Sequence, residues 1–103
     1  MSLFIMMTRL APAAMKSPRS LQESERSAMD RIKKECPQVE WLQNYAVMGP
    51  YDYLDIFQAP DLETAFKVSA IIRTLGHGQT EVWPATEWSF FKGWIGDLTE
   101  TES

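Results

Sequence analysis

The chain has 103 residues and a mass of 11.8 kDa, which suits one domain and excludes tandem domains. Hydrophobic residues make up 45% and charged residues 23%, so the chain is typical of a folded protein and not of a disordered or fibrous one. The net charge of −4 is uneven, because residues 1–34 carry seven Lys or Arg against three acids, and residues 35–103 carry three against eleven. The basic residues are interleaved with acids, so we expect no nucleic-acid partner.

The composition also limits the compartment and the chemistry. A single cysteine, Cys36, cannot form a disulfide within the chain, which favours a reducing, cytoplasmic location. The longest apolar run, Leu3 to Met7, is much shorter than the roughly 20 residues that span a bilayer, so we expect no membrane association. One histidine and one distant cysteine offer no metal-ligand spacing, so we expect no metal and no other cofactor.

The first half of the chain predicts a strand followed by a helix. The short apolar run from Phe4 to Leu10 is typical of a strand buried on both faces. Ser20 and Glu23 match a capping box and predict that a helix begins there, and Pro37 ends it. Its buried face is expected at five apolar positions with helical spacing: Leu21, Ala28, Met29, Ile32 and Cys36.

A hairpin is predicted next. Residues 39–48 alternate with a period of two, and so do residues 52–58 after the break at Gly49 and Pro50. Leu54 and Ile56 lie on one face of the second strand. Its other face carries Tyr53, Asp55 and Phe57.

The remaining elements are a helix, a strand and an aromatic tail. Asp61 is expected to cap the second helix and Gly76 to follow its end in a left-handed conformation. The predicted buried stripe of that helix contains Leu62, Ala65, Phe66, Ser69 and Ile72. Residues 79–83 predict the last core strand, which ends at Pro84. The tail element at residues 87–98 carries Trp88, Phe90, Phe91, Trp94 and Ile95.

This order predicts an α+β fold of the ferredoxin-like βαββαβ type over residues 1–84. Its four-stranded antiparallel sheet has the spatial order 4-1-3-2, with two helices on one face. Residues 85–103 are expected to be an aromatic C-terminal extension with a frayed end.

Several short motifs carry a resemblance to a known family. The chain reads Gly-Pro-Tyr-Asp at residues 49–52, Ala-Pro-Asp at 59–61, Leu-Gly at 75–76 and Thr-Glu at 80–81. In this order and spacing, over roughly residues 4–84, it resembles the GYD domain family. The resemblance implies a ferredoxin-like domain of the dimeric α/β-barrel type, in a family without an established biochemical role. Asp55 departs from the pattern, since members tend to be apolar there.

The sheet face away from the helices decides the expected assembly. Strand alternation predicts eight residues on it: Trp41, Gln43, Tyr45, Tyr53, Asp55, Phe57, Glu81 and Trp83. Such a face is too apolar to leave in water, so we expect a homodimer that packs sheet against sheet, or a larger oligomer built on it. The aromatic tail is interpreted as packing over a sheet edge of its own chain or of the partner.

Asp55 is a second candidate feature, because burying a carboxylate in a central strand is costly unless it is paired. One interpretation is an acid or base of raised pKa in a pocket between subunits, beside Tyr45 and Tyr53. The other is a structural hydrogen bond to a tyrosine or to Gln43. Trp41, Tyr45, Tyr51, Tyr53 and Asp55 are the candidate ligand-binding residues.

Arg9, Asp52 and His77 are the candidate catalytic residues, because the topology brings them to one edge of the sheet. A carboxylate that orients a histidine would suit acid-base chemistry. Alternatively, Asp52 binds backbone N–H groups at the turn and His77 is a solvated loop residue.

Three functions remain open. The first is a homodimeric domain that binds a small apolar or aromatic ligand or serves as an accessory module. The second is a cofactor-independent monooxygenase or isomerase, and the third is a ligand-sensing regulatory module. Whether the protein is an enzyme is left undecided, since a fold does not fix a function.

Overall fold

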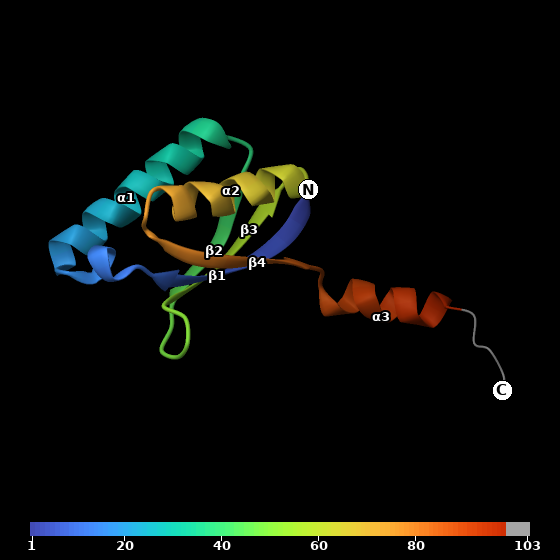
Figure 1. The fold of residues 1–103 in the computed structure, drawn as a ribbon. Helices are drawn as coiled ribbons and strands as arrows, with labels where there is room; N and C mark the ends of the chain where they lie inside the picture. The colour runs from blue at the N-terminus through green and yellow to red at the C-terminus, as the bar shows by residue number, and fades with distance from the viewer. Residues whose placement is uncertain (99–103) are drawn as a thin grey trace.

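A computed structural model of the chain describes residues 1–98. It contains four strands and three α-helices, with a short 3-10 helix, η1, after the first strand (Figure 1). The elements in chain order are β1 (Ser2–Leu10), η1 (Pro12–Met15), α1 (Pro18–Glu35), β2 (Glu40–Ala46), β3 (Tyr53–Ala59), α2 (Leu62–Thr74), β4 (Gly78–Ala85) and α3 (Trp88–Asp97). No helix within residues 1–98 is long and apolar enough to cross a membrane.

The strands form one antiparallel sheet in the order β2-β3-β1-β4. The predicted order 4-1-3-2 is this order read from the opposite edge. α1 and α2 lie side by side over one face of the sheet, and α3 extends beyond it (Figure 1). The α+β fold with a four-stranded antiparallel sheet is therefore confirmed.

The start of α1 differs from the predicted one. Ser17 is the N-cap, and its side chain accepts a hydrogen bond from the Ser20 backbone while Ser20 Oγ accepts one from the Ser17 backbone. Pro18 occupies the first turn, where its fixed φ and missing N–H are no disadvantage. Glu23 instead pairs with Arg19 at 3.0 Å, so the predicted Ser20 and Glu23 capping box was wrong by one turn.

The ends of α2 agree with the sequence, and its buried face agrees in part. Asp61 Oδ1 accepts from the Thr64 backbone N–H at 2.8 Å, and Gly76 has a φ of 73°, the left-handed conformation that glycine tolerates. The buried residues are Ala65, Val68, Ser69 and Ile72. Leu62 and Phe66 are exposed, so their predicted burial was wrong.

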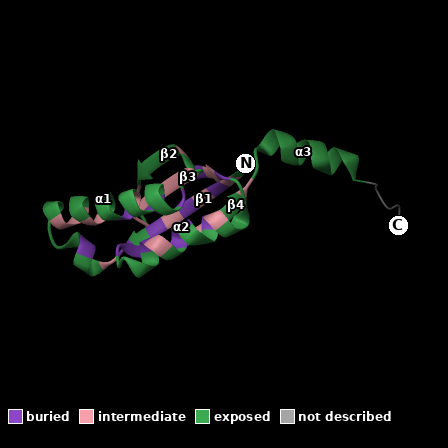
Figure 2. Ribbon diagram, turned by 90° about the horizontal axis from the view of Figure 1, so that it is seen from above, coloured by how far each residue is buried: buried purple, intermediate pink, exposed green. Residues whose placement is uncertain are grey.

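β1 buries one face and not two. Phe4, Met6, Thr8 and Leu10 are buried under the helices, whereas the alternate residues are half-buried or exposed (Figure 2). The side chains of α1 and α2 complete this core, mainly through Ala28, Ile32, Cys36, Ala65, Val68 and Ile72. We call the sheet face under the helices the covered face and the other the open face.

Register places the two faces of the hairpin differently from the prediction. Phe57, Asp55 and Tyr53 pair with Phe4, Met6 and Thr8 of β1, which puts them on the covered face. A bulge between Trp41 and Gln43 shifts the alternation of β2, so Trp41 packs against Phe57 at 5.1 Å between ring centroids. The prediction that Trp41, Tyr53, Asp55 and Phe57 lie away from the helices was wrong.

The open face remains largely apolar, though with other residues. Register assigns to it Leu3, Ile5, Met7 and Arg9 of β1, Gln43 and Tyr45 of β2, Leu54, Ile56 and Gln58 of β3, and Gln79, Glu81, Trp83 and Ala85 of β4. The predicted positions of Gln43, Tyr45, Glu81 and Trp83 agree with this assignment.

β4 forms an edge of the sheet and is longer than predicted. It includes Pro84, which an edge strand tolerates because no neighbour requires its missing N–H. Arg73 of α2 donates to the Thr80 carbonyl at 2.6 Å. Gly78 lies so close to β1 that a Cβ at this position would overlap the Arg9 carbonyl oxygen.

Candidate functional site

A cavity of about 430 Å³ opens between α1 and the covered face of the sheet. We call it the helix-side cavity. Its apolar walls come from Met6, Leu21, Ala28, Met29, Trp41 and Ile72, and its polar groups from Thr8, Gln22, Glu25, Asn44, Tyr53, Asp55 and His77. An apolar chamber with a few convergent polar side chains is the usual composition of a small-molecule site.

Asp55 is one polar group of this cavity. Its Oδ1 accepts a hydrogen bond from Asn44 Nδ2 at 2.7 Å, across the β2–β3 pair. Burial raises the pKa of the Asp55 carboxyl, the Asn44 hydrogen bond opposes that rise, and the charge of Glu25 adds to it. The carboxyl is therefore easier to protonate than an exposed one.

His77 is the second titratable group. It is 4% exposed, and its Nδ1 shares a hydrogen bond with Ser24 Oγ of α1 at 2.6 Å. The Tyr53 ring stacks on the imidazole at 6.3 Å between centroids. Burial lowers the pKa of His77, with Glu25 opposing the shift, so the neutral imidazole dominates at neutral pH.

The floor of the cavity contains a polar atom without a protein partner. Thr8 Oγ1 is buried and has no hydrogen-bond partner among the described residues. Leaving a buried hydroxyl unpaired is costly. Thr8 adjoins Tyr53 in the sheet register, and both residues line the cavity together with His77.

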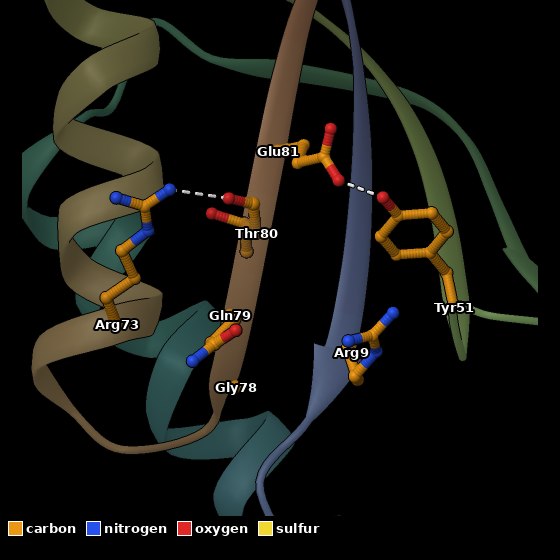
Figure 3. A pocket seen from close by; sticks show the side chains of 7 residues that line it. All are labelled: Arg9, Tyr51, Arg73, Gly78, Gln79, Thr80 and Glu81. Atoms are coloured by element: carbon orange, nitrogen blue, oxygen red, sulfur yellow. Dashed lines mark hydrogen bonds between the residues drawn. The ribbon is translucent and has the colours of Figure 1, made fainter.

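A second hollow, of about 540 Å³, lies along the edge strand and is lined by Arg9, Tyr51, Arg73, Gly78, Gln79, Thr80 and Glu81 (Figure 3). We call it the β4 groove. The Tyr51 hydroxyl donates to Glu81, and the Arg9 guanidinium stacks over the Tyr51 ring at 5.5 Å. Figure 3 places Arg9 and Arg73 on opposite sides of β4, so the two guanidinium groups do not converge on one ligand.

The three candidate catalytic residues do not form one constellation. Asp52 Oδ2 accepts from the Leu10 backbone N–H at 2.8 Å, and Arg9 Nε donates to the Pro50 carbonyl at 2.9 Å. His77 faces the helix-side cavity and binds Ser24. Asp52 is thus occupied in joining the strand ends, and His77 is buried rather than solvated.

The candidate ligand-binding residues divide between the two hollows. Trp41, Tyr53 and Asp55 line the helix-side cavity, and Tyr51 lines the β4 groove. Tyr45 borders the helix-side cavity, but its hydroxyl donates to Gln43 Oε1 on the open face at 3.1 Å. The Asp55 pocket lies within one chain, under α1, and its hydrogen-bond partner is Asn44 rather than a tyrosine or Gln43.

Sequence reasoning did not single out Thr8, Gln22, Glu25 and Asn44, which line the helix-side cavity. It also missed Ser24, whose hydroxyl shares a hydrogen bond with His77. Ser24 and Glu25 follow Leu21 at helical spacing and precede Ala28, so they share the face that was predicted to be buried. That signal was present in the sequence. The position of Asn44 on the covered face could not be predicted without knowing of the bulge in β2.

The described residues offer no evident metal or nucleophile site. Within residues 1–98, no three His, Cys, Asp or Glu side chains converge on a point where a metal could bind. Cys36 is buried in the core, and burial raises the pKa of its thiol, which disfavours the reactive thiolate.

Comparison with solved structures shows the same fold in several proteins. FFRP-DM1 is 20% identical, with a TM-score of 0.54 and coverage of 84% of this chain and 100% of that one. TTHA0845 from Thermus thermophilus is 22% identical, with a TM-score of 0.56 and coverage of 84% and 95%. Ribosomal protein S6 from Thermotoga maritima is 12% identical, with a TM-score of 0.56 and coverage of 92% and 95%.

None of the curated proteins compared with the chain matches it. The family models give a clear result, because the model described as GYD domain matches residues 4–95. This range contains β2, β3, β4, both helices of the covered face, and most of β1 and α3. The chain belongs to the GYD domain family.

Proposed function

We propose that this protein is a homodimer of the dimeric α/β-barrel type that binds a small, mainly apolar ligand in the helix-side cavity. The observation that carries the ligand proposal is the buried, unpartnered Thr8 hydroxyl in an apolar chamber of about 430 Å³. A ligand with a polar group could satisfy this hydroxyl, whereas the apolar walls favour a hydrocarbon or aromatic body.

The polar groups of the cavity favour an uncharged ligand. Burial raises the pKa of Asp55 and lowers that of His77, so both environments favour the uncharged side chain. Asp55 Oδ2 and His77 Nε2 have no protein hydrogen bond among those of the described residues. They supply a hydrogen-bonding pair for a hydroxyl or carbonyl group of a bound molecule.

A second candidate function is cofactor-independent proton transfer, as in an isomerase. Its support is that a carboxyl of raised pKa and an imidazole of lowered pKa line one cavity. Such shifts bring the two groups closer in acidity, which suits a proton passing between them and a bound substrate.

The homodimer proposal rests on the open face. Leu3, Ile5, Met7, Leu54 and Ile56 are only half-buried in the single chain, and Trp83 is 45% exposed. A contiguous apolar sheet face of this kind marks an interface. A second copy is a fitting partner, because a two-fold axis presents the same apolar surface on both sides.

The ligand proposal is tested by binding of 2-naphthol, a neutral aromatic alcohol, measured by calorimetry at pH 7. Leu21→Trp adds bulk to the cavity wall that α1 forms, and Arg26→Trp adds a tryptophan at an exposed position of the same helix. We expect binding to be lost in Leu21→Trp and retained in Arg26→Trp. Equal binding by both variants would contradict the proposal.

The enzyme candidate is separated from the binding one by a ligand retained through purification and identified by native mass spectrometry. Conversion of that compound by the wild type, but not by Asp55→Asn, would favour proton transfer. Unchanged compound after prolonged incubation would favour binding alone.

A further inference from the structure

The C-terminal helix α3 is strongly amphipathic, yet nothing in the described chain covers it. At 100° per residue, one half of the helix carries the large apolar side chains and the other half carries polar or small ones. The apolar half contains Trp88, Phe90, Phe91, Trp94, Ile95 and Leu98, all of them between 42% and 69% exposed. The other half contains Ser89, Lys92, Gly93, Gly96 and Asp97.

Such a helix needs a surface to pack on. Isolated helices shorter than roughly 12–15 residues are marginal in water, and Gly93 and Gly96 weaken this ten-residue helix further. Its own domain does not provide that surface in this arrangement, since α3 leaves the end of β4 and extends away from the sheet (Figures 1 and 2). None of its residues is buried.

We propose that the apolar half of α3 packs on a second copy of this chain, reciprocally in the two subunits. This inference rests on the homodimer proposed above. α3 follows directly from β4, whose Trp83 and Ala85 lie on the open face, so the apolar surface of the open face continues into α3. A helix that projects beyond its own sheet at a two-fold interface is placed to reach the partner.

The apolar surface area of α3 supports a second copy of this chain as the partner. Aromatic side chains bury roughly 150–250 Å² each, so covering the half-exposed apolar side chains of α3 removes roughly 500 Å² from water. A stable interface buries roughly 800 Å² per partner. The contribution of α3 is therefore a large part of what a dimer needs, in addition to the open face.

Charge argues against a membrane as the occupant. Helices that lie on anionic membranes carry several Lys or Arg on their polar face. α3 has one, Lys92, against Glu87 at its start and Asp97 at its end, and the sequence that follows includes Glu100 and Glu102. An acidic segment of this kind is repelled by an anionic surface.

The experiment compares a charge placed on the two halves of the same helix in the full chain. Phe91→Glu changes the apolar half, and Ser89→Glu changes the polar half two residues away. Dimer dissociation is measured by analytical ultracentrifugation over nanomolar to micromolar concentration. We expect the dissociation constant to rise at least tenfold in Phe91→Glu and to stay within about twofold in Ser89→Glu.

A photo-crosslink identifies the surface that α3 contacts. Benzoylphenylalanine in place of Phe91 is irradiated in the full chain, and a covalent dimer joined at that position supports the proposal. Crosslinks confined to one chain would overturn it. So would binding of the wild type, but not of Phe91→Glu, to neutral phosphatidylcholine vesicles without a covalent dimer.

Ile56→Glu on the open face separates this inference from the dimer itself. If Ile56→Glu dissociates the dimer while Phe91→Glu does not, the role of α3 is wrong and the dimer stands. If the wild type is monomeric at all concentrations, the dimer and the α3 contact both fail.

Discussion

Asn44 Nδ2 and Asp55 Oδ1 lie 2.7 Å apart on the covered face of the sheet. The two residues are directly paired in the β2–β3 register, so the amide reaches the carboxyl without displacing either strand. This single hydrogen bond partly offsets the burial of Asp55, whose pKa is nevertheless raised. The carboxyl is retained in the wall of a cavity at a cost in folding free energy.

Because burying the charged Asp55 carboxylate is costly, Asp55→Asn should stabilise the fold at neutral pH. An amide oxygen still accepts from Asn44, but it carries no charge. Because the folded pKa lies above the ordinary value of 3.8, stability that is fully present below that value is lost as the pH rises through the folded pKa. We expect Asp55→Asn to raise the melting temperature by a few degrees at pH 7 and to leave it nearly unchanged at pH 3. Thermal unfolding followed by circular dichroism measures both, and a lower melting temperature at pH 7 would contradict the assignment.

His77 predicts a pH dependence of the opposite sign. Its folded pKa lies below the ordinary value of 6.5, so stability present above 6.5 is lost as the pH falls through the folded pKa. His77→Asn keeps a hydrogen-bonding group near Ser24 but does not titrate. Chemical unfolding between pH 7 and pH 4.5 should show the wild type losing more stability than the variant. Parallel curves for the two proteins would show that His77 does not titrate with folding.

Replacing a glycine by alanine should have a much larger effect on folding stability at Gly78 than at Gly93. A methyl group there would overlap the Arg9 carbonyl oxygen, so β1 and β4 would have to separate. We expect Gly78→Ala to destabilise the domain by about 2 kcal/mol, within the range for overpacking. Gly93→Ala in α3 is the control, since apart from the neighbouring backbone of its own helix no atom lies within 4 Å of the added Cβ. Urea unfolding should show that this control is neutral or slightly stabilising.

The assignment of sheet faces predicts different roles for adjacent residues of β3. Phe57 is fully buried, so Phe57→Ala should cost about 3–5 kcal/mol of folding stability. Ile56 lies half-buried on the open face, so Ile56→Ala should cost only about 1 kcal/mol of folding stability and chiefly weaken the proposed dimer. Urea unfolding and ultracentrifugation distinguish the two effects. Similar losses of folding stability would mean that the faces are assigned incorrectly.

The capping box predicts which serine starts α1. Ser17→Ala removes the side-chain acceptor for the Ser20 N–H and should cost about 1 kcal/mol. Glu23→Ala removes only the exposed pair with Arg19 and should change stability by less than about 0.5 kcal/mol. If urea unfolding showed a larger stability loss for Glu23→Ala than for Ser17→Ala, Ser20 and not Ser17 would be the N-cap.

The elements and their order were predictable because local patterns specify them. Asp61 and Gly76 mark the ends of α2 through capping chemistry that acts within a few residues. The faces of the hairpin were less predictable, since Tyr53 and Phe57 alternate with Leu54 and Ile56 and both sets are apolar. Only pairing with β1 decides which set meets the helices.

The candidate site was also predictable only where local sequence patterns specify it, and not where it depends on strand pairing. Asp55 and His77 could be selected as single residues, because a carboxyl in a strand and a lone histidine are distinctive. Their surroundings could not, since the bulge that brings Trp41 and Asn44 to the covered face depends on the β2–β3 register. Asp52 bonds to Leu10, 42 positions away in sequence, a contact that no local pattern encodes.

The exposed edge of β4 has a consequence for how copies of the chain can assemble. Arg73 occupies the carbonyl of Thr80, and Pro84 provides no N–H, so an incoming strand would find an interrupted ladder. Growth by strand addition, which leads to open-ended fibrils, is thereby disfavoured. The proposed association through the open face would instead close upon itself, because both copies would use the same surface.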